Sequence, residues 1–321
     1  MTTALRSYWH PVAAVDELDA GPIKATLLDE DLVVFRSGSE IHALLDLCVH
    51  RGSRLSMGHV DESGCIVCPY HGWTYDTSGT CVTIPSQPPD AQKIPSKARV
   101  PAYRTAEHYG LVYVALEDPV APVPDFPEFD AGFNIIRTGE WTWKSSAGRF
   151  VENAIDIAHL PFVHPGLLAA PDATVISPFE MEETDQGFAF SAKRNDVDAA
   201  MFGDADELVT QKTWIEMPYS WRLLISADGL ETVVFIANQP ISGDVVRFWE
   251  IIGQRGRITQ TDEEVTAFHR KVLDQDQAIV ENQRPEMLPL DITAELHLKV
   301  ADEPALEYRR RLAALTGTEF A

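Results

Sequence analysis

The sequence of 321 residues contains only four cysteines and no run of eighteen or more apolar residues. Four cysteines in a chain of this length are too few for a disulfide scaffold. The sequence predicts no transmembrane helix, and its first residues, MTTALRSYWHPV, lack the charged and apolar sections of a signal peptide. We therefore expect a cytoplasmic protein in which clustered Cys and His residues are available as metal ligands.

Basic residues are also scarce, because 26 Lys and Arg stand against 49 Asp and Glu and give a formal net charge of -23 at pH 7. Nucleic acids and anionic membrane surfaces attract proteins through Lys and Arg. This balance therefore argues against nucleic acid and membrane partners. The sequence also lacks a Gly-rich dinucleotide fingerprint, so we expect no NAD(P)H site within this chain.

The chain is long enough for two domains. Short β-rich segments separated by Gly, Asp and Ser predict a small antiparallel assembly that ends with GLVYVALEDP, residues 110–119. The segment PVAPVPDFPEF that follows holds four prolines and favours an extended linker. The sequence thus predicts domains at residues 1–118 and 130–321, joined by a linker at residues 119–129.

The second domain is expected to begin with strands and to end in helices, which predicts an α+β fold class. The strand segments are EWTWKSS, GFAFSAK, TWIEMP, WRLLISA, ETVVFIANQP and VVRFWEIIG. Residues 261–283 predict a helix whose start is indicated by Thr261 and the three acidic residues after it. A second helix is expected over PALEYRRRLAAL, and residues 150–164 favour a helix that Pro161 ends.

Two unlike Cys-His pairs stand out, namely Cys48-x-His50 in CVHRG and Cys68-x-x-His71 in CPYHGW. A structural zinc could take such ligands, but zinc loops usually place two cysteines within one turn. Here each loop provides one thiolate and one imidazole. This arrangement favours a two-iron cluster in which one iron takes both thiolates and the other takes both imidazoles. A zinc-stabilised binding module remains the alternative.

A second metal pattern lies in ENAIDIAHLPFVH, where His159 and His164 are five residues apart. Two imidazoles and one carboxylate form the ligand set that leaves positions open on Fe(II) for dioxygen and substrate. The downstream helix offers Asp274, Asp276 and Glu281 as the carboxylate. Asp274 and Asp276 lie about 200° apart around a helix, so only one of the two can face a cavity.

The first pattern resembles the Rieske iron–sulfur proteins. The resemblance implies that Cys48, His50, Cys68 and His71 hold a Rieske 2Fe-2S cluster in an all-β N-terminal domain. A Rieske domain also occurs in proteins that only transfer electrons. An electron-transfer protein with a ligand-binding domain is therefore one interpretation of the whole chain. The residues after the linker distinguish it from an enzyme.

The string Asn153-x-x-Asp156-x-x-His159-x-x-x-x-His164 resembles the mononuclear iron site of the Rieske non-haem iron oxygenases. Together the two patterns extend this resemblance over essentially the whole chain. It implies a C-terminal helix-grip domain, in which a curved antiparallel sheet wraps around a helix. It also implies that His159, His164 and Asp276 bind iron, Asp276 being the acid before QAIVENQ, and that Asp156 and Asn153 take part in catalysis.

The resemblance also implies how electrons reach the iron. Asp156 would connect His159 to His71 of the partner subunit, so the working unit would be an oligomer, expected to be a homotrimer. A plain helix-terminal carboxylate is the alternative for Asp156. Electrons would come from NAD(P)H indirectly, through a separate reductase with or without a ferredoxin, to one cluster and one iron per chain.

The Asn-x-x-Asp spacing and the C-terminal RPEMLPLDITAELHLKVADEPALEYRRRL resemble the branch of vanillate and dicamba O-demethylases and methylxanthine N-demethylases. This resemblance implies a monooxygenase of aromatic catabolism that uses O2 to demethylate a small aromatic or heteroaromatic molecule. Ring cis-dihydroxylation and C–H hydroxylation remain alternatives. Residues that are candidates for lining the substrate cavity are Asn153, Phe162, Leu167, Leu168, Trp214, Ile225, Phe235 and Asn238.

Overall fold

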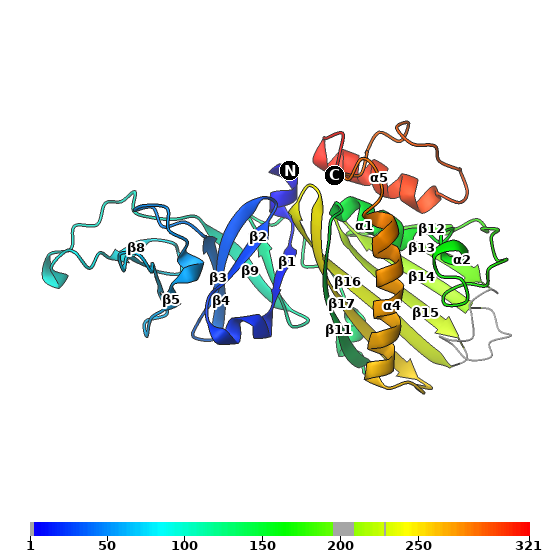
Figure 1. Cartoon of the computed structure of the whole chain (residues 1–321), viewed down its shortest axis with the longest axis horizontal. Helices are drawn as coiled ribbons and strands as arrows, with labels where there is room; N and C mark the ends of the chain where they lie inside the picture. Colours follow the sequence, from blue (N-terminus) through cyan, green and yellow to red (C-terminus); the bar gives the residue numbers. More distant parts are fainter. Residues whose placement is uncertain (1–2, 195–208, 228) are drawn as a thin grey trace. The chain divides into compact units, whose positions relative to one another are not determined.

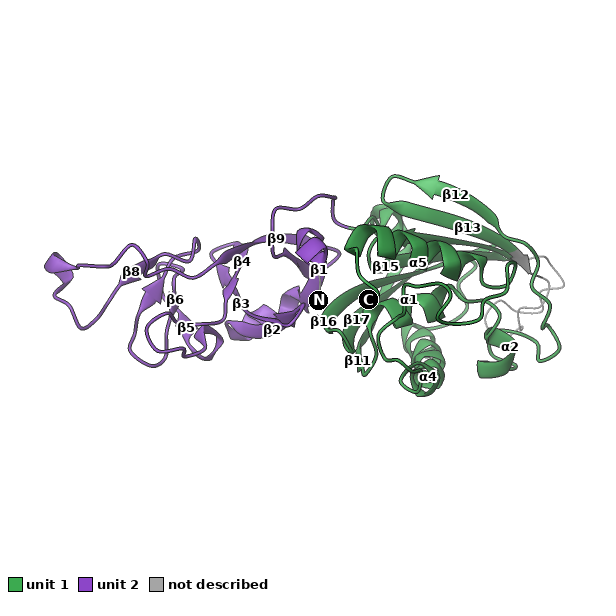
Figure 2. Ribbon diagram, turned by 90° about the horizontal axis from the view of Figure 1, so that it is seen from above, with its two compact units in different colours: residues 1–2, 124–321 green, residues 3–123 purple. Residues whose placement is uncertain are grey.

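The computed structural model describes residues 3–194, 209–227 and 229–321, and the chain divides into two compact units (Figure 2). The N-terminal unit comprises residues 3–123, and the C-terminal unit begins at Pro124. The division falls within the Pro-rich segment for which the sequence predicts a linker. Among the described residues, no helix combines the length and the apolar character needed to cross a membrane.

The N-terminal unit consists of two antiparallel sheets. The larger sheet has the strand order β1-β10-β9-β4-β3-β2, and the smaller one has the order β5-β6-β7-β8. The larger sheet contains β1 (His10–Ala14), β2 (Ile23–Leu27), β3 (Glu30–Ser37), β4 (Glu40–Leu45), β9 (Ala102–His108) and β10 (Leu111–Ala115). The smaller sheet contains β5 (His59–Val60), β6 (Ile66–Val67), β7 (Thr74–Tyr75) and β8 (Cys81–Thr83). The 3-10 helix η1 (Thr3–Ser7) precedes β1, and the 3-10 helices η2 (Val15–Ala20), η3 (Leu55–Met57) and η4 (Pro89–Ala91) lie between strands.

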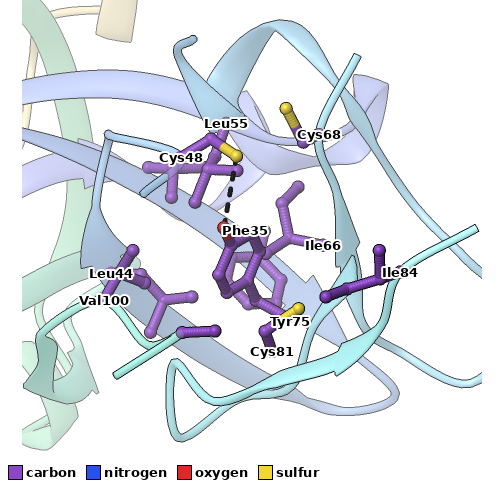
Figure 3. Close-up of a cluster of buried hydrophobic side chains, with 12 residues drawn as sticks. Phe35, Leu44, Cys48, Leu55, Ile66, Cys68, Tyr75, Cys81, Ile84 and Val100 are labelled. Atoms are coloured by element: carbon purple, nitrogen blue, oxygen red, sulfur yellow. Dashed lines mark hydrogen bonds between the residues drawn. The ribbon is translucent and has the colours of Figure 1, made fainter. Parts of the chain in front are cut away.

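The two Cys-His loops are anchored in the hydrophobic core of this unit. Cys48 and Cys68 belong to one buried cluster with side chains from both sheets, including Phe35, Ile66 and Tyr75 (Figure 3). Burying such a set removes a large apolar area from water, which stabilises the fold by roughly 25 cal/mol per Å². The loops that carry the two thiols are therefore held by the core itself.

The C-terminal unit is built on a seven-stranded antiparallel sheet with the order β11-β17-β16-β15-β14-β13-β12. The strands are β11 (Asn134–Trp143), β12 (Glu180–Thr184), β13 (Gly187–Arg194), β14 (Val209–Glu216), β15 (Ser220–Ala227), β16 (Leu230–Ser242) and β17 (Val245–Gly256). The helices are η5 (Pro127–Asp130), α1 (Ala147–Ile155), α2 (Leu160–Val163), α4 (Asp262–Val280) and α5 (Glu303–Thr316). Figure 1 shows α4 lying along the sheet, so the α+β class with an antiparallel sheet around a helix is confirmed.

Helix α4 begins where the sequence predicts. The Thr261 hydroxyl accepts a hydrogen bond from the Glu264 N–H, and the Glu264 carboxylate accepts one from the Thr261 N–H at 2.8 Å. This reciprocal capping box satisfies two N–H groups that the helix itself leaves unpaired. The buried side chains of the helix are Val265, His269, Leu273, Asp276 and Val280, whose spacing of three and four residues forms a single face.

The helix expected over residues 150–164 is instead two helices. Helix α1 ends at Ile155, Asp156 has an extended conformation (φ -80°, ψ 124°), and α2 begins at Leu160. The prediction that Pro161 ends a helix is wrong, because Pro161 lies in the first turn of α2. A proline is tolerated there because the N–H that it lacks would have no partner within the helix.

A buried network of ion pairs joins α1, α5 and the segment before α5. Arg309 contacts Glu152 at 2.7 Å and also pairs with Glu295, while Arg149 contacts Glu295 at 2.6 Å. Both arginines are almost completely buried, with exposed fractions of 3% for Arg149 and 1% for Arg309. The network fixes α1, and α1 leads directly into the segment that carries the two iron-ligand candidates His159 and His164.

Replacing Arg309 with Met should destabilise the C-terminal unit by roughly 1.5–3 kcal/mol, because Glu152 and Glu295 would lose hydrogen bonds to a buried charged partner and keep only their contacts with Arg149 among the described residues. Arg310, the next residue, pairs with no acid other than Glu307 among the described residues, and it is exposed, so Arg310→Met should change stability by less than about 0.5 kcal/mol. Denaturant unfolding followed by tryptophan fluorescence measures both, since five of the seven tryptophans lie in this unit. Equal effects of the two variants would contradict a stabilising role for the network.

Candidate metal centres and substrate cavity

The two Cys-His loops share one hydrogen-bonded frame. In the first loop the Cys48 N–H bonds to the Ser53 C=O at 2.8 Å, and the Gly52 N–H bonds to the Cys48 C=O at 2.9 Å. The second loop repeats both bonds from Cys68 and Gly72, at 2.9 and 3.0 Å. The two glycines have φ of 71° and 69°, a left-handed conformation that few other residues adopt. The two loops thus have the same backbone frame from Cys to Gly, although the histidine stands at a different position in each.

The four candidate ligands divide into a buried pair and an exposed pair. The thiols of Cys48 and Cys68 belong to residues that are only 2% exposed, whereas His50 and His71 are exposed with ring centroids 4.5 Å apart. A Rieske cluster needs two thiolates on one iron and two imidazoles on the other. The donor set therefore fits such a cluster, with the imidazole side facing outward.

Tyr75 and Trp73 support this donor set. The Tyr75 hydroxyl lies 3.2 Å from the Cys48 sulfur, and the Trp73 ring stacks on His50 with centroids 4.6 Å apart. Burial, and then the hydrogen bond with Cys48, raise the pKa of Tyr75, so the phenol stays protonated and donates to a thiolate. Such hydrogen bonds to a cluster thiolate stabilise the reduced state and raise the reduction potential.

The second candidate centre brings together three side chains from distant segments. The nearest oxygen of Asp276, Oδ1, lies 3.0 Å from His164 Nε2 and 3.5 Å from His159 Nε2. The ligand atoms of the three residues all lie within 4.8 Å of one another. Two neutral imidazoles and one carboxylate in this arrangement suit a non-haem Fe(II) with open positions.

The surroundings of His164 prepare it as a ligand. Its Nδ1 lies 2.9 Å from the side-chain oxygen of Gln275, which can only accept, so Nδ1 carries the proton and Nε2 is left for a metal. Burial lowers the pKa of His164, but the hydrogen bond and charge of Asp276 outweigh burial and raise it overall. A divalent cation would take the place of the proton that this carboxylate favours.

Asp156 lies on the outer side of His159. Its Oδ1 accepts the Ala158 N–H at 2.7 Å, and its Oδ2 lies 3.4 Å from His159 Nδ1, the nitrogen opposite the one facing Asp276. The two residues meet through the extended backbone at position 156 and not along one face of a helix. Of the two acids weighed on α4, Asp276 is buried and Asp274 is exposed.

A cavity of about 130 Å³ adjoins the triad. Engineered cavities of about 150 Å³ accommodate a benzene ring, so this one has the size for a small aromatic molecule. The residues that line it are Phe150, Asn153, Ala154, Asp156, Ile157, His159, Leu160, His164, Leu168, Val209, Gln211, Trp221, Leu223, Ile225, Val234, Ile236, Glu250, Phe268, His269, Val272, Leu273 and Asp276. Most are apolar, which is typical of pockets for small organic ligands.

Three of the residues proposed from sequence line this cavity, namely Asn153, Leu168 and Ile225. The proposed residues that do not line it are Phe162, Leu167, Trp214, Phe235 and Asn238. Phe162 is 69% exposed, and Phe235 alternates with Val234 and Ile236, which do face the cavity. Because side chains alternate along a strand, residues two and four positions before Ile225 face the same side as Ile225. Trp221 and Leu223, which also line the cavity, could have been found from Ile225 in this way.

Asp276→Ala should reduce the mononuclear iron from about one per chain to nearly none, since a ligand lost from a three-residue site greatly weakens binding. The cluster spectrum should persist because its candidate ligands lie in the other unit. Asp274→Ala is the matched control, exposed on the same helix, and should retain iron. Iron and acid-labile sulfide analysis gives both values, and full iron retention in Asp276→Ala would exclude Asp276 as a ligand.

Comparison with known families matches the two units separately. Residues 8–104 match the Rieske [2Fe-2S] domain, and residues 143–317 match the vanillate O-demethylase oxygenase C-terminal domain. Both matches agree with the division of the fold, and the first argues against a zinc-stabilised module.

Curated relatives match nearly the whole chain. Methylxanthine N1-demethylase NdmA of Pseudomonas putida is 31% identical over 97% of this chain and 89% of its own length. Methylxanthine N3-demethylase NdmB of the same organism is 30% identical over 99% of this chain and 92% of its own length.

Solved structures agree. Pseudomonas putida CBB5 NdmA with caffeine superimposes with a TM-score of 0.89 at 31% identity, covering 98% of this chain and 92% of that chain. Dicamba monooxygenase bound to dicamba has the same fold, with a TM-score of 0.80 at 20% identity over 99% and 98% of the two chains. With its two domain matches and these full-length relatives, the chain belongs to the Rieske non-haem iron oxygenases, within their demethylase branch.

Proposed function

We propose that this oxygenase removes a methyl group from the oxygen or nitrogen of a small aromatic or heteroaromatic molecule. The observation that carries the proposal is the apolar cavity beside the triad of His159, His164 and Asp276. Support also comes from the similarity to NdmA and NdmB, whose names describe demethylation of methylxanthines.

The proposed reaction is a monooxygenation. One atom of O2 is inserted into a methyl C–H bond, and the other atom leaves as water after uptake of two electrons and two protons. The resulting hemiacetal or hemiaminal loses formaldehyde and leaves the demethylated oxygen or nitrogen with a hydrogen. Iron bound by the triad would supply the activation of O2. The chain's own apolar side chains, such as Leu223, Ile225 and Val234, would hold the ring and exclude bulk water.

The two electrons must enter from outside this chain. We expect them to come from NAD(P)H through a separate reductase, with or without a ferredoxin, to a Rieske cluster held by Cys48, His50, Cys68 and His71. Because His50 and His71 are exposed, the imidazole side of the cluster is open to a redox partner. An acidic net charge of -23 would favour a partner with a basic docking face.

Product analysis tests demethylation directly. The oxygenase is combined with a generic NADH-dependent reductase, 18O-labelled dioxygen and a panel of methoxyarenes, N-methyl heterocycles and plain arenes. Formaldehyde should equal the amount of substrate lost, with one molecule per methyl group removed. A product that carries two labelled oxygens, without formaldehyde, would replace this proposal by ring cis-dihydroxylation.

Asp156 is proposed to transfer electrons from His71 of the partner subunit to His159, in an assembly expected to be a homotrimer. Its Oδ2 is 3.4 Å from His159 Nδ1, and its side chain is 33% exposed, so a second chain can reach it.

Asp156→Asn should keep cluster and iron contents unchanged but slow turnover by about 10- to 100-fold, because the uncharged amide would not replace the carboxylate that connects His159 to His71 of the partner subunit. Stopped-flow absorbance should show the reduced cluster reoxidising more slowly in the presence of substrate and O2. Unchanged reoxidation would assign Asp156 a purely structural role, and iron loss would point to support of His159.

A further inference from the structure

The cavity contains one polar assembly that the metal centre does not use. Glu250 on β17 and His269 on α4 both line the cavity, and their exposed fractions are 3% and 6%. Glu250 Oε1 lies 3.0 Å from His269 Nδ1, and the hydroxyl of Thr138 donates to Glu250 Oε2 at 2.5 Å. Three elements thus contribute to one buried hydrogen-bonded group.

The placement of Thr138 depends on an irregularity in the sheet. The pairing of β11 with β17 shifts register between Arg137 and Gly139, so Thr138 is the extra residue of a bulge opposite Glu250. Bulges redirect a side chain and often lie beside active sites. Here the bulge turns a hydroxyl toward the carboxylate, and both carboxylate oxygens are occupied by donors.

These contacts determine what His269 offers to a ligand. An ionised carboxylate only accepts hydrogen bonds, so Nδ1 of His269 carries a proton and donates it to Glu250. The other ring nitrogen, Nε2, makes no hydrogen bond to any residue in the described part of the chain. Nε2 of His269 is therefore available to form a hydrogen bond with a polar atom of a molecule bound in the cavity.

The distance along α4 suits a ring held between the metal and His269. His269 and Asp276 are seven residues apart, so they share one face of the helix and lie about 10 Å apart along its axis. Apolar side chains from the sheet, including Leu223 and Ile236, line the same cavity. A methyl group at the metal would place the far edge of a small ring near His269.

The charges of the residues that line the cavity determine which polar substituent of a ring can bind there. The lining residues include Asp156, Glu250 and Asp276 but no Lys or Arg within the described part of the chain. The segments outside that part, residues 195–208 and residue 228, contain no Lys or Arg in their sequence. Lys193 and Arg194, at the end of β13, are the basic residues of this region whose side chains the structure does not describe. Unless one of them reaches the cavity, a ring carboxylate would meet Glu250 without a guanidinium or ammonium group to balance it.

We propose that the cavity selects an uncharged ring whose polar edge hydrogen-bonds to His269, and that Glu250 excludes ring carboxylates. The inference rests on the proposed function, because it names the class of substrate for the same cavity. Glu250 and Thr138 act as positioning residues, since they reach the substrate through His269.

Three probes with one ring and one methoxy group test the proposal, namely 4-methylanisole, 4-methoxyphenol and 4-methoxybenzoate. Their affinities for the holoenzyme are measured by calorimetry without reductase. The phenol should bind about threefold to tenfold more tightly than methylanisole, the effect of one hydrogen bond. The benzoate should bind at least about tenfold more weakly than the phenol because of the buried like charge. Equal affinities of the phenol and the benzoate would overturn the proposal without any variant.

Variants separate the contributions of the two residues. Glu250→Gln should reduce the difference in affinity between 4-methoxyphenol and 4-methoxybenzoate. His269→Phe should abolish the tighter binding of 4-methoxyphenol relative to 4-methylanisole. Glu231→Gln is the matched control, because Glu231 pairs with Arg255 on the same sheet and does not line the cavity. An unchanged gap in Glu250→Gln would overturn the role of that carboxylate.

Arg194 requires its own variant because it is paired with Val209, a lining residue, in the register of β13 and β14. Tight benzoate binding that is lost in Arg194→Gln would overturn the proposal. Formaldehyde release separates the two hypotheses. If the affinities are as predicted but no probe releases formaldehyde, the proposed selectivity is supported and demethylation of these probes is refuted. If the benzoate binds tightly and is demethylated efficiently, demethylation is supported and the proposed selectivity is refuted.

Discussion

The iron-ligand candidates depend on the rotation of α4 about its own axis, because one oxygen of Asp276 has to face the imidazoles of His159 and His164. Asp276 and His164 are 112 residues apart in the sequence, so only tertiary packing brings them together. The apolar face of α4 supplies that packing. A rotation by one residue, about 100°, would turn the carboxylate away from the histidines.

The same helix face also sets the geometry of the substrate cavity. Leu273 lies between His269 and Asp276 on that face, so the polar end and the metal end of the cavity belong to one rigid element. The sheet contributes the apolar wall, and α1, fixed by its buried arginine network, leads into the segment with the two histidines. Small shifts of α4 would therefore change metal geometry and substrate position together.

Local patterns in the sequence predict the parts of this protein that depend on spacing. Examples are the Cys-His pairs, the start of α4 at Thr261, and the burial of only one of the two acids Asp274 and Asp276. The strand faces are different, because a shift of one residue exchanges inward and outward side chains, as Phe235 illustrates. The hydrogen bond from Thr138 to Glu250 depends on the bulge between Arg137 and Gly139, and Gly139, whose φ is 139°, is the residue in the strand that marks it.

The shared frame of the two Cys-His loops has a consequence for protein engineering. Both loops close with a bond from the N–H of a glycine to the C=O of the cysteine four residues earlier, although the histidine stands at the third position in one and the fourth in the other. The distance from Cys to Gly is therefore the same in both loops, and the position of the histidine within it differs. An insertion between Cys and Gly would break the hydrogen bond that closes either loop.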